Sequence, residues 1–388
     1  MKNRLLIFGF ILLAGFSCQS KEPKLPDTPL SEQNLKFEIY DSLVVDYLGN
    51  LILMDISPDQ KHFLLIDQNT DSIFVTDPMG VILNRYIRSG EGPEDYNDTR
   101  SGLAKFISNT EFILPATRGM YLYSLAGDLN QKYTVDFYSD VAIVVSNSDN
   151  IALNGNKIYT NLSGRYTDQG FEGVEYQQKA RKIEVLDLQT GEFSPALPFP
   201  KASRFSSETE IHPAIAYYTN LAILDDSLFV SFRNEATIYI YSLSNLDSAF
   251  SFKVIPFEKF ILAKPTDPND DAAFRMRDLF VGTVNRVIPL GNGEFIVDFL
   301  SGLSDEEVDP ILNEAGTDFS KMFEEANKIN TAGRVVFDGK AISPIIEKPE
   351  ILGSLTKFVS RDEIWFALNF SEVENDYSVI YKTRLAEK

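Results

Sequence analysis

The chain has 388 residues, and its 56 Asp and Glu against 36 Lys and Arg give a formal net charge of −20. Nucleic-acid binding depends on Lys and Arg displacing counterions from phosphates, so this composition argues against a nucleic-acid partner. The acidic surface is either a solvated exterior or one that binds cations or basic partners. A single cysteine rules out an intramolecular disulfide and a cysteine-rich metal site.

Residues 1–17 have the pattern of an export signal. Lys2 and Arg4 precede an apolar run from Leu5 to Phe16, which is too short to span a bilayer comfortably as a helix. Cys18 follows directly, as in bacterial lipoprotein signals. We therefore expect Cys18 to be lipidated and to become the first mature residue, which makes the membrane a partner through the lipid anchor. The alternative is an ordinary signal peptide with a cysteine there by chance.

Residues 18–34 contain three prolines and many polar residues, which predicts a flexible tether. Lys21-Glu22 resembles the charged signal that sends Bacteroidota lipoproteins to the cell surface. We therefore expect an outer-membrane lipoprotein that is either surface-exposed or faces the periplasm.

A strand–turn–strand pattern recurs six times between residue 56 and residue 368. Each copy joins a short apolar stretch, a polar turn and an alternating run, and a second turn and run follow. The copies are 56–67, 107–116, 146–162, 221–230, 287–299 and 358–368. Repeated units of this kind indicate a radial array, so the sequence predicts an all-β, six-bladed β-propeller that forms one domain over residues 35–388.

Residues 35–49 read as a strand with no partner of their own. In many propellers an N-terminal strand completes the last blade, because ring closure removes two exposed sheet edges. We expect this segment to pair with the C-terminal strand near Val379–Thr383.

The later repeats are spaced more widely than the roughly 40–50 residues of a minimal blade, so we expect insertions at 163–180, 198–215, 264–283 and 304–329. The last insertion reads as helical. Ser304 and Glu307 match a capping box, and Phe319, Met322, Phe323 and Ala326 recur at helical spacing. We expect this apolar face to pack on the propeller. The alternatives are contact with a partner or cover over a ligand.

The loop after the first repeat reads Arg88-Ser89-Gly90-Glu91-Gly92-Pro93-Glu94-Asp95-Tyr96. It resembles the G-x-G-P-x-x-Y segment of Bacteroidota lipoproteins of the six-bladed β-propeller type, including related families of unknown function. The resemblance implies an envelope-anchored propeller, and it supplies no catalytic residues.

This loop is the candidate ligand-binding site, with Arg88, Glu91 and Arg100 as polar contacts. The structural alternative is that both arginines pair with acids of the loop, that Gly90 and Gly92 allow positive φ, and that Tyr96 packs against the blade.

Catalytic and cofactor signatures are missing from the sequence. No G-x-S-x-G, P-loop or dinucleotide motif occurs, and we expect no cofactor. His62 reads as a blade residue and His212 as exposed, and two isolated histidines argue against a metal site. Residues Asp267–Asp271 read as a helix cap, with calcium binding as the alternative.

The function favoured is a non-enzymatic binding or scaffold propeller in the envelope, whose ligand is a glycan, a peptide or an envelope protein. The alternative is a glycan-active hydrolase or lyase that uses carboxylates in the central funnel.

Overall fold

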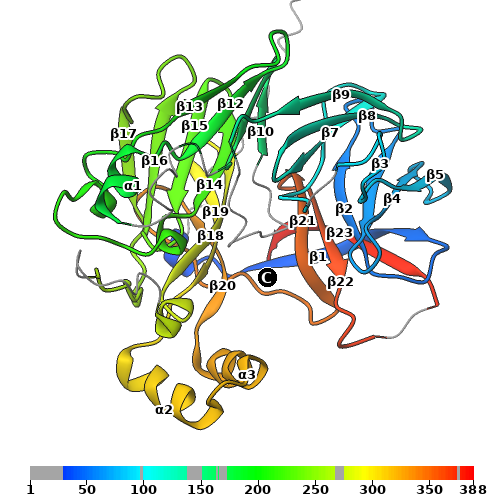
Figure 1. The fold of residues 1–388 in the computed structure, drawn as a ribbon. Coiled ribbons are helices and arrows are strands. Elements are labelled where there is room, and N and C mark those ends of the chain that lie inside the picture. The colour runs from blue at the N-terminus through cyan, green and yellow to red at the C-terminus, as the bar shows by residue number, and fades with distance from the viewer. Residues whose placement is uncertain are drawn as a thin grey trace, which may run out of the picture.

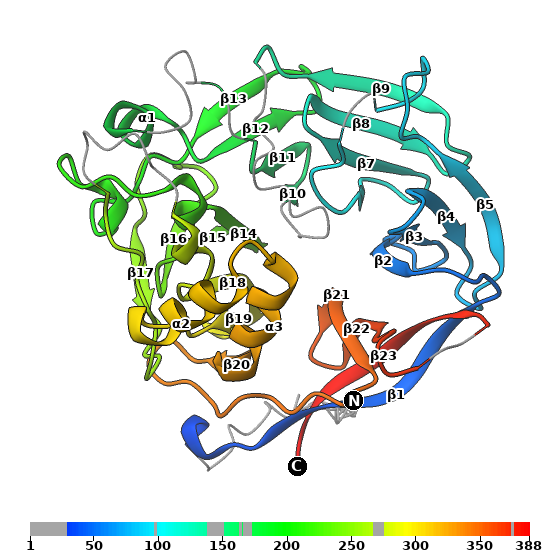
Figure 2. The ribbon, with the colours of Figure 1, turned by 60° about the horizontal axis from the view of Figure 1, so that its bottom comes forward.

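The computed structural model describes residues 29–96, 99–137, 151–162, 165, 173–266, 275–373 and 376–388. Six antiparallel sheets follow one another around a ring in chain order, as the colours of Figures 1 and 2 show. The predicted six-bladed propeller is therefore confirmed. No described helix is long and apolar enough to cross a membrane.

Five blades have four strands. Blades are numbered along the chain, and their strands are given from the axis outward. Blade 1 contains β2 (Leu51–Ile56), β3 (Phe63–Asp67), β4 (Ser72–Thr76) and β5 (Ile82–Ile87), and blade 2 contains β6 (Lys105–Phe106), β7 (Glu111–Ala116), β8 (Gly119–Ser124) and β9 (Leu129–Thr134). Blade 3 contains β10 (Ile151–Asn154), β11 (Lys157–Thr160), β12 (Ile183–Asp187) and β13 (Phe193–Ala196). Blade 4 contains β14 (Thr219–Leu224), β15 (Ser227–Phe232), β16 (Thr237–Ser242) and β17 (Ser251–Val254). Blade 6 contains β21 (Leu352–Ser360), β22 (Glu363–Leu368), β23 (Ser378–Glu387) and β1 (Leu35–Val45).

Burial along the strands follows from this architecture. Middle strands such as β4 and β16 are buried on both faces, because each blade packs between two others. The outermost strand β5 alternates between partly buried and exposed residues. The aromatic or aliphatic residues at the centre of each sequence repeat all fall on the second strand from the axis: Phe63, Phe112, Ile158, Phe229, Phe295 and Trp365.

Blade 5 has three strands, β18 (Thr283–Gly291), β19 (Glu294–Leu300) and β20 (Ala332–Phe337). An irregular segment takes the place of the fourth. The Ser343 N–H donates to the Val336 carbonyl at 2.8 Å and the Ile346 N–H to the Arg334 carbonyl at 2.7 Å. Pro344 interrupts the segment and lacks the N–H that a regular ladder needs.

The ring is closed by the two ends of the chain, as expected. Strand β1 pairs antiparallel with β23, and the register places Val44 opposite Val379 and Ile39 opposite Thr383. Strand β1 is also hydrogen-bonded to the segment that follows blade 5, since the Phe37 N–H donates to the Glu347 carbonyl at 2.9 Å. Closure therefore combines strand pairing with contacts to the preceding blade.

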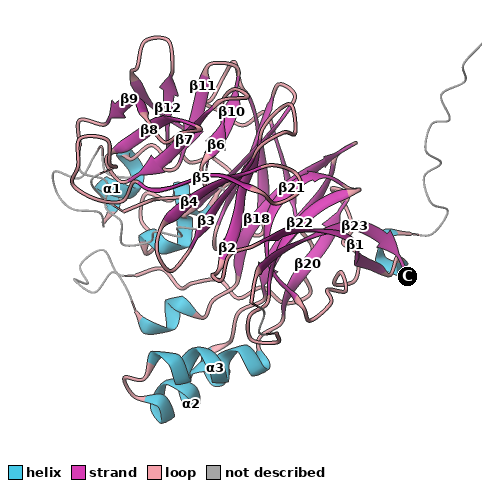
Figure 3. Ribbon diagram, turned by 90° about the vertical axis from the view of Figure 1, so that its right-hand side faces the viewer, coloured by secondary structure: helices cyan, strands magenta, loops and turns pink. Residues whose placement is uncertain are grey.

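Two helices, α2 (Asp305–Ala315) and α3 (Phe319–Ile329), lie between β19 and β20 and project from one face of the ring (Figure 3). The Ser304 N–H donates to the Glu307 side chain at 2.7 Å at the start of α2. The helices pack on the propeller through a small cluster, formed by Phe280, Leu303, Val308, Met322 and Ala326.

The prediction that the apolar face of this insertion packs on the propeller is corrected in part, because Phe319 and Phe323 are 50% and 42% exposed. The other helical segments are short: α1 (Val174–Lys179), η1 (Leu30–Glu32), η2 (Arg204–Ser206), η3 (Ala214–Tyr217) and η4 (Met276–Leu279). Residues Asp267–Asp271, the predicted cap or calcium site, lie outside the described residues.

Candidate functional site

A cavity of about 570 Å³ lies at the propeller axis, and the innermost strand of every blade lines it. These strands are β2, β6, β10, β14, β18 and β21. A volume of this size suits a small organic ligand, for which pockets span roughly 300–1,000 Å³. Since the strands around it are fixed by the packing of the blades, the site is largely preformed.

Three charged residues of the cavity wall lie side by side in blade 5. The strand register places Arg286 of β18 opposite Asp298 of β19, and Asp298 opposite Arg334 of β20. Asp298 and Arg334 form an ion pair at 2.7 Å. The Arg286 Nη1 donates to the Leu355 carbonyl of blade 6 at 2.9 Å, which fixes the guanidinium between two blades.

A second charged set combines residues from three blades. Asp55 of β2 is 5% exposed and forms an ion pair with Lys357 of β21. Its other oxygen accepts the Phe106 N–H of β6 at 2.8 Å. Lys105, the first residue of β6, also lines the cavity. The carboxylate of Asp55 therefore sits where blades 1, 2 and 6 meet.

The described part of the cavity wall contains more cations than carboxylates. Among the described lining residues, four are cationic (Lys105, Arg286, Arg334 and Lys357) and two are carboxylates (Asp55 and Asp298), which leaves a net charge of +2. All six come from blades 5, 6, 1 and 2. Blades 3 and 4 contribute a wall of aliphatic residues in which Asn220 is the one polar side chain among those described.

The predicted binding loop lies on the connection from the outer strand β5 to the inner strand β6. The Arg88 Nε donates to the Gly127 carbonyl at 2.6 Å, and its guanidinium forms an ion pair with Glu94 at 3.1 Å. Arg100 is 5% exposed, and its Nη1 donates to the Gly102 carbonyl at 3.0 Å. Glu91 is exposed.

None of Arg88, Glu91 and Arg100 lines the axial cavity. Burial lowers the pKa of Arg100 from its ordinary value, although the nearby Tyr96 and Asp71 oppose that shift. The pairing of Arg88 with Glu94 is the kind of internal contact that the structural interpretation expected. Ligand contact through this loop stays a prediction.

Gly90 and Gly92 serve a different purpose from the one expected, since neither is among the glycines with positive φ. A Cβ at Gly90 would lie 2.5 Å from the Asp95 carboxylate, and one at Gly92 would lie 2.8 Å from it. The Gly92 N–H donates to that carboxylate at 2.9 Å. The two glycines therefore make room for Asp95, and Tyr96 is buried against Tyr121 as expected.

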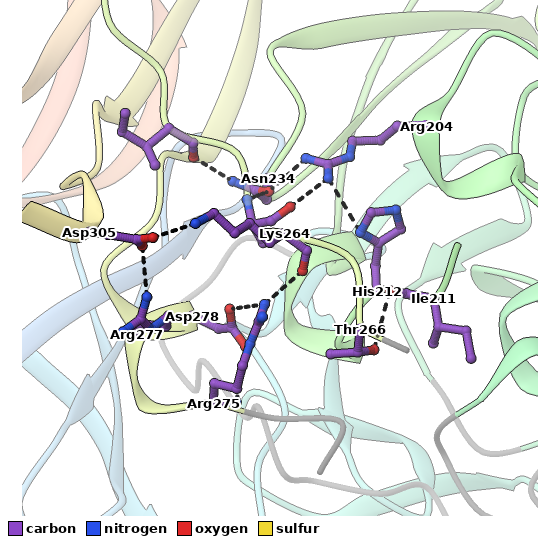
Figure 4. Close-up of polar contacts among 12 residues, drawn as sticks. Arg204, Ile211, His212, Asn234, Lys264, Thr266, Arg275, Arg277, Asp278 and Asp305 are labelled. Carbon is purple, nitrogen blue, oxygen red and sulfur yellow. Dashed lines mark hydrogen bonds and ion pairs between the residues drawn. The ribbon is translucent and has the colours of Figure 1, made fainter. Parts of the chain in front are cut away.

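His212 is buried, so the prediction that it is exposed was wrong. It is 2% exposed, and its ring packs edge-to-face on Phe205 at 5.1 Å. Figure 4 shows the Arg204 guanidinium directed at its Nδ1, at 3.4 Å. Pro213 places the following residues into a 3-10 turn, and the insertion folds back on blade 4 instead of extending into solvent.

The environment of His212 predicts acid lability. Burial, followed by the Arg204 guanidinium, lowers the pKa of His212 from 6.5 to about 4. The folded state therefore takes up this proton less readily than the unfolded chain. The contribution of His212 to the free energy of unfolding is fully present above pH 6.5. It falls by up to about 3 kcal/mol as pH drops from 6.5 to 4.

We expect a His212→Gln variant to lose less stability than the wild type over this pH range. The measurement is the free energy of urea unfolding at pH 7.5, 6, 5 and 4. Parallel curves for the two proteins would contradict the assignment.

Among the described residues, no group of three or more His, Cys, Asp or Glu is placed to hold a metal ion.

No family model matches the sequence, and no curated protein matches it. Solved structures resemble the fold. A member of the DUF4221 family from Bacteroides vulgatus aligns with 92% of this chain and 100% of its own, with a TM-score of 0.63 and 11% identity. A protein of Bacteroides fragilis described as exported aligns with 92% of this chain and 96% of its own, with a TM-score of 0.49 and 14% identity. At 11% identity, the likeness to the Bacteroides vulgatus structure shows the fold alone.

The sequence could not reveal the axial cavity as a site. Its charged residues come from four blades and stand one to a strand, and the paired Asp55 and Lys357 are separated by 302 positions in the sequence. No local motif marks them. The strand pattern of each repeat is local, so it does not say which side chains of different blades meet at the axis.

Proposed function

We propose that this protein is a non-enzymatic, ligand-binding propeller of the bacterial envelope and that its ligand binds in the axial cavity. The observation that carries the proposal is the preformed cavity of about 570 Å³ at the axis, to which every blade contributes its inner strand. An axis plugged by side chains would have favoured a purely structural scaffold. Rigid walls with a few fixed polar groups are typical of small-molecule sites.

The charged groups of the cavity favour binding over catalysis. A glycosidase needs a pair of carboxyl groups, one of which donates a proton to the leaving group. The two described carboxylates here, Asp55 and Asp298, lie in different blades, and each is ion-paired with a cation. Hydrolase or lyase activity is therefore the alternative that the experiment below would detect.

The test uses a variant that fills the cavity. Ala222 of β14 lines the cavity, so Ala222→Trp places an indole in it. Leu83 of β5 is 47% exposed on the outer rim, and Leu83→Trp is the matched control. Purified protein is screened by thermal shift and calorimetry against mono- and disaccharides, short peptides and organic acids.

We expect a ligand that binds the wild type and the Leu83→Trp variant but not the Ala222→Trp variant. Equal binding by all three proteins would place the site elsewhere, with the Arg88–Arg100 loop tested next. Release of reducing ends or unsaturated sugars from a bound glycan would replace the binding function with the enzymatic one.

The proposed location in the envelope has its own prediction. Cys18 is the sole cysteine and directly follows the apolar run of the signal. We expect wild-type protein to fractionate with membranes and to carry a lipid on Cys18 by mass spectrometry. The Cys18→Ser variant should appear in the soluble fraction, whereas a variant that stays with the membrane would contradict lipid anchoring through this residue.

A further inference from the structure

We propose that the two insertions on either side of β12 and β13 form an acid-sensitive latch, in which the amine of Lys182 keeps α1 and η3 packed on the propeller while it is neutral and releases them when it takes up a proton. The latch consists of residues 173–182, which contain α1, and residues 197–218, which contain η2 and η3. None of these residues lines the axial cavity, so the inference goes beyond the proposed function.

Lys182 is a buried base with few partners. The residue is 6% exposed, and among the described residues its Nζ makes one hydrogen bond, a long one of 3.4 Å to the Gln177 carbonyl of α1. It makes no ion pair with the described residues, and Arg181, the charge that acts on it, is also a cation. An ammonium has three donors, and burying them without acceptors costs free energy. These surroundings therefore suit an uncharged amine.

Three aromatic rings surround this amine, and they come from both insertions. The Nζ lies 3.7 Å from the ring centroid of Phe199, 4.8 Å from that of Tyr217 in η3 and 5.9 Å from that of Tyr176 in α1. Aromatic faces attract an ammonium, so the rings offset part of the cost of a buried charge. Burial has the larger effect, and with the charge of Arg181 it lowers the pKa of Lys182 well below its ordinary value.

The ionisable groups that face the amine are few. Tyr176 faces it from α1 and Tyr217 from η3, whereas the ring of Phe199 does not titrate. The charged residues of α1, Glu175 and Lys179, are exposed and pair with each other. A proton taken up at this place therefore adds a positive charge for which the described part of the latch offers no carboxylate.

Gln177 connects the amine to the second insertion. Its side chain is buried, and its Nε2 donates to the carbonyls of Phe205 at 3.1 Å and Glu210 at 3.0 Å. Its Oε1 accepts the His212 N–H at 2.9 Å. Since the carbonyl of the same residue accepts the amine of Lys182, a lysine that moves toward water disturbs contacts of both insertions.

The backbone beside the amine is strained in the closed state. The Lys182 N–H donates to the carbonyls of Ala196 and Leu197, both at 3.0 Å. Leu197 is fully buried and has a φ of 63°, a left-handed conformation that bulky residues rarely adopt. Release of the segment lets Leu197 return to an ordinary φ, so relief of strain favours the open state once the amine is charged.

The direction of the pH effect follows from proton linkage. The pKa of Lys182 is lower in the closed state than in the open state, so the open state binds the proton more tightly. The closed state has its full stability above about pH 10.5 and loses it as pH falls toward the lowered pKa. Because one proton is involved, the opening equilibrium rises by at most about tenfold per pH unit.

The test is hydrogen exchange of the whole protein between pH 9 and pH 7, with protection corrected for the intrinsic exchange rate. This window lies above the range in which His212 takes up its proton. We expect protection of α1 and η3 to be lower than that of β4, and to fall by up to about tenfold per pH unit as pH falls. Equal protection of all three elements at every pH would mean global unfolding only, and would overturn the latch.

Lys182→Met separates the charge from the packing, because methionine is a flexible, uncharged side chain that fills similar space. It should remove the pH dependence and raise the protection of α1 at pH 7. Lys201→Met is the matched control, since Lys201 is exposed in the same insertion, and it should behave as the wild type. Wild-type pH dependence in Lys182→Met would overturn the proposal, as would constant protection in the wild type. Circular dichroism checks that each variant is folded, and the wild-type comparison decides the matter if Lys182→Met is not.

Discussion

Replacing Asn234 with alanine is expected to lower the free energy of unfolding by about 3–5 kcal/mol, because it removes four hydrogen bonds, among them those to the buried Ala263 N–H and the Gly282 carbonyl. Asn234 is fully buried, and its amide makes four hydrogen bonds. Its Nδ2 donates to the carbonyls of Gly282 at 2.6 Å and Ile261 at 3.0 Å. Its Oδ1 accepts the Ala263 N–H at 2.7 Å and the Arg204 Nη1 at 3.2 Å.

The size of this effect follows from what the amide connects. Figure 4 shows Asn234 between Arg204, which belongs to the insertion before blade 4, and the segment that leads to Lys264 and Thr266 after that blade. An alanine offers no replacement for these bonds. Each orphaned buried group costs about 1–3 kcal/mol, and the loosened segments recover part of that by reaching water.

The measurement is urea unfolding followed by tryptophan fluorescence and circular dichroism. Asn130→Ala is the matched control, since Asn130 is exposed and its side chain donates to Glu111 at 2.8 Å. The control should change stability by less than about 0.5 kcal/mol. A change of that size for Asn234→Ala would mean that the network does not hold the two segments together.

The fold was predictable because each blade repeats one local pattern. The residues at the centre of the six repeats all fall on the second strand from the axis, and segment 35–49 contains the strand that closes the ring. These features depend on short-range alternation and on the need to remove sheet edges, both of which a sequence displays directly.

Other features depend on contacts between distant residues and were missed. Blade 5 reads as a full repeat, but Pro344 and the passage of the chain toward β1 leave its outer position irregular. His212 stands among polar residues and prolines, which is typical of an exposed loop, yet the insertion folds over the aromatic cluster around Phe205. The charged cavity wall is assembled from four blades, so no stretch of sequence contains it.

The second large effect is expected at the closure of the ring, where Phe37→Ala should destabilise the protein by about 3–5 kcal/mol. Phe37 lies on β1 and is 1% exposed. Its ring packs edge-to-face on Phe366 at 4.9 Å, within a core that also includes Ile346 of the irregular segment after blade 5. Truncation therefore leaves a cavity at the joint where the first strand meets the last blade.

This site tests closure as well as packing. Val44 lies on the same strand and is 46% exposed, so Val44→Ala should cost less than about 1 kcal/mol. If β1 completes the core of blade 6, hydrogen exchange in the Phe37→Ala variant should rise first in β1 and in its partner β23, before the inner strands of the other blades. A small loss of stability with unchanged exchange in both strands would show that the ring does not depend on this strand. Because β1 is the strand that joins the start of the chain to the last blade, we expect the larger effect.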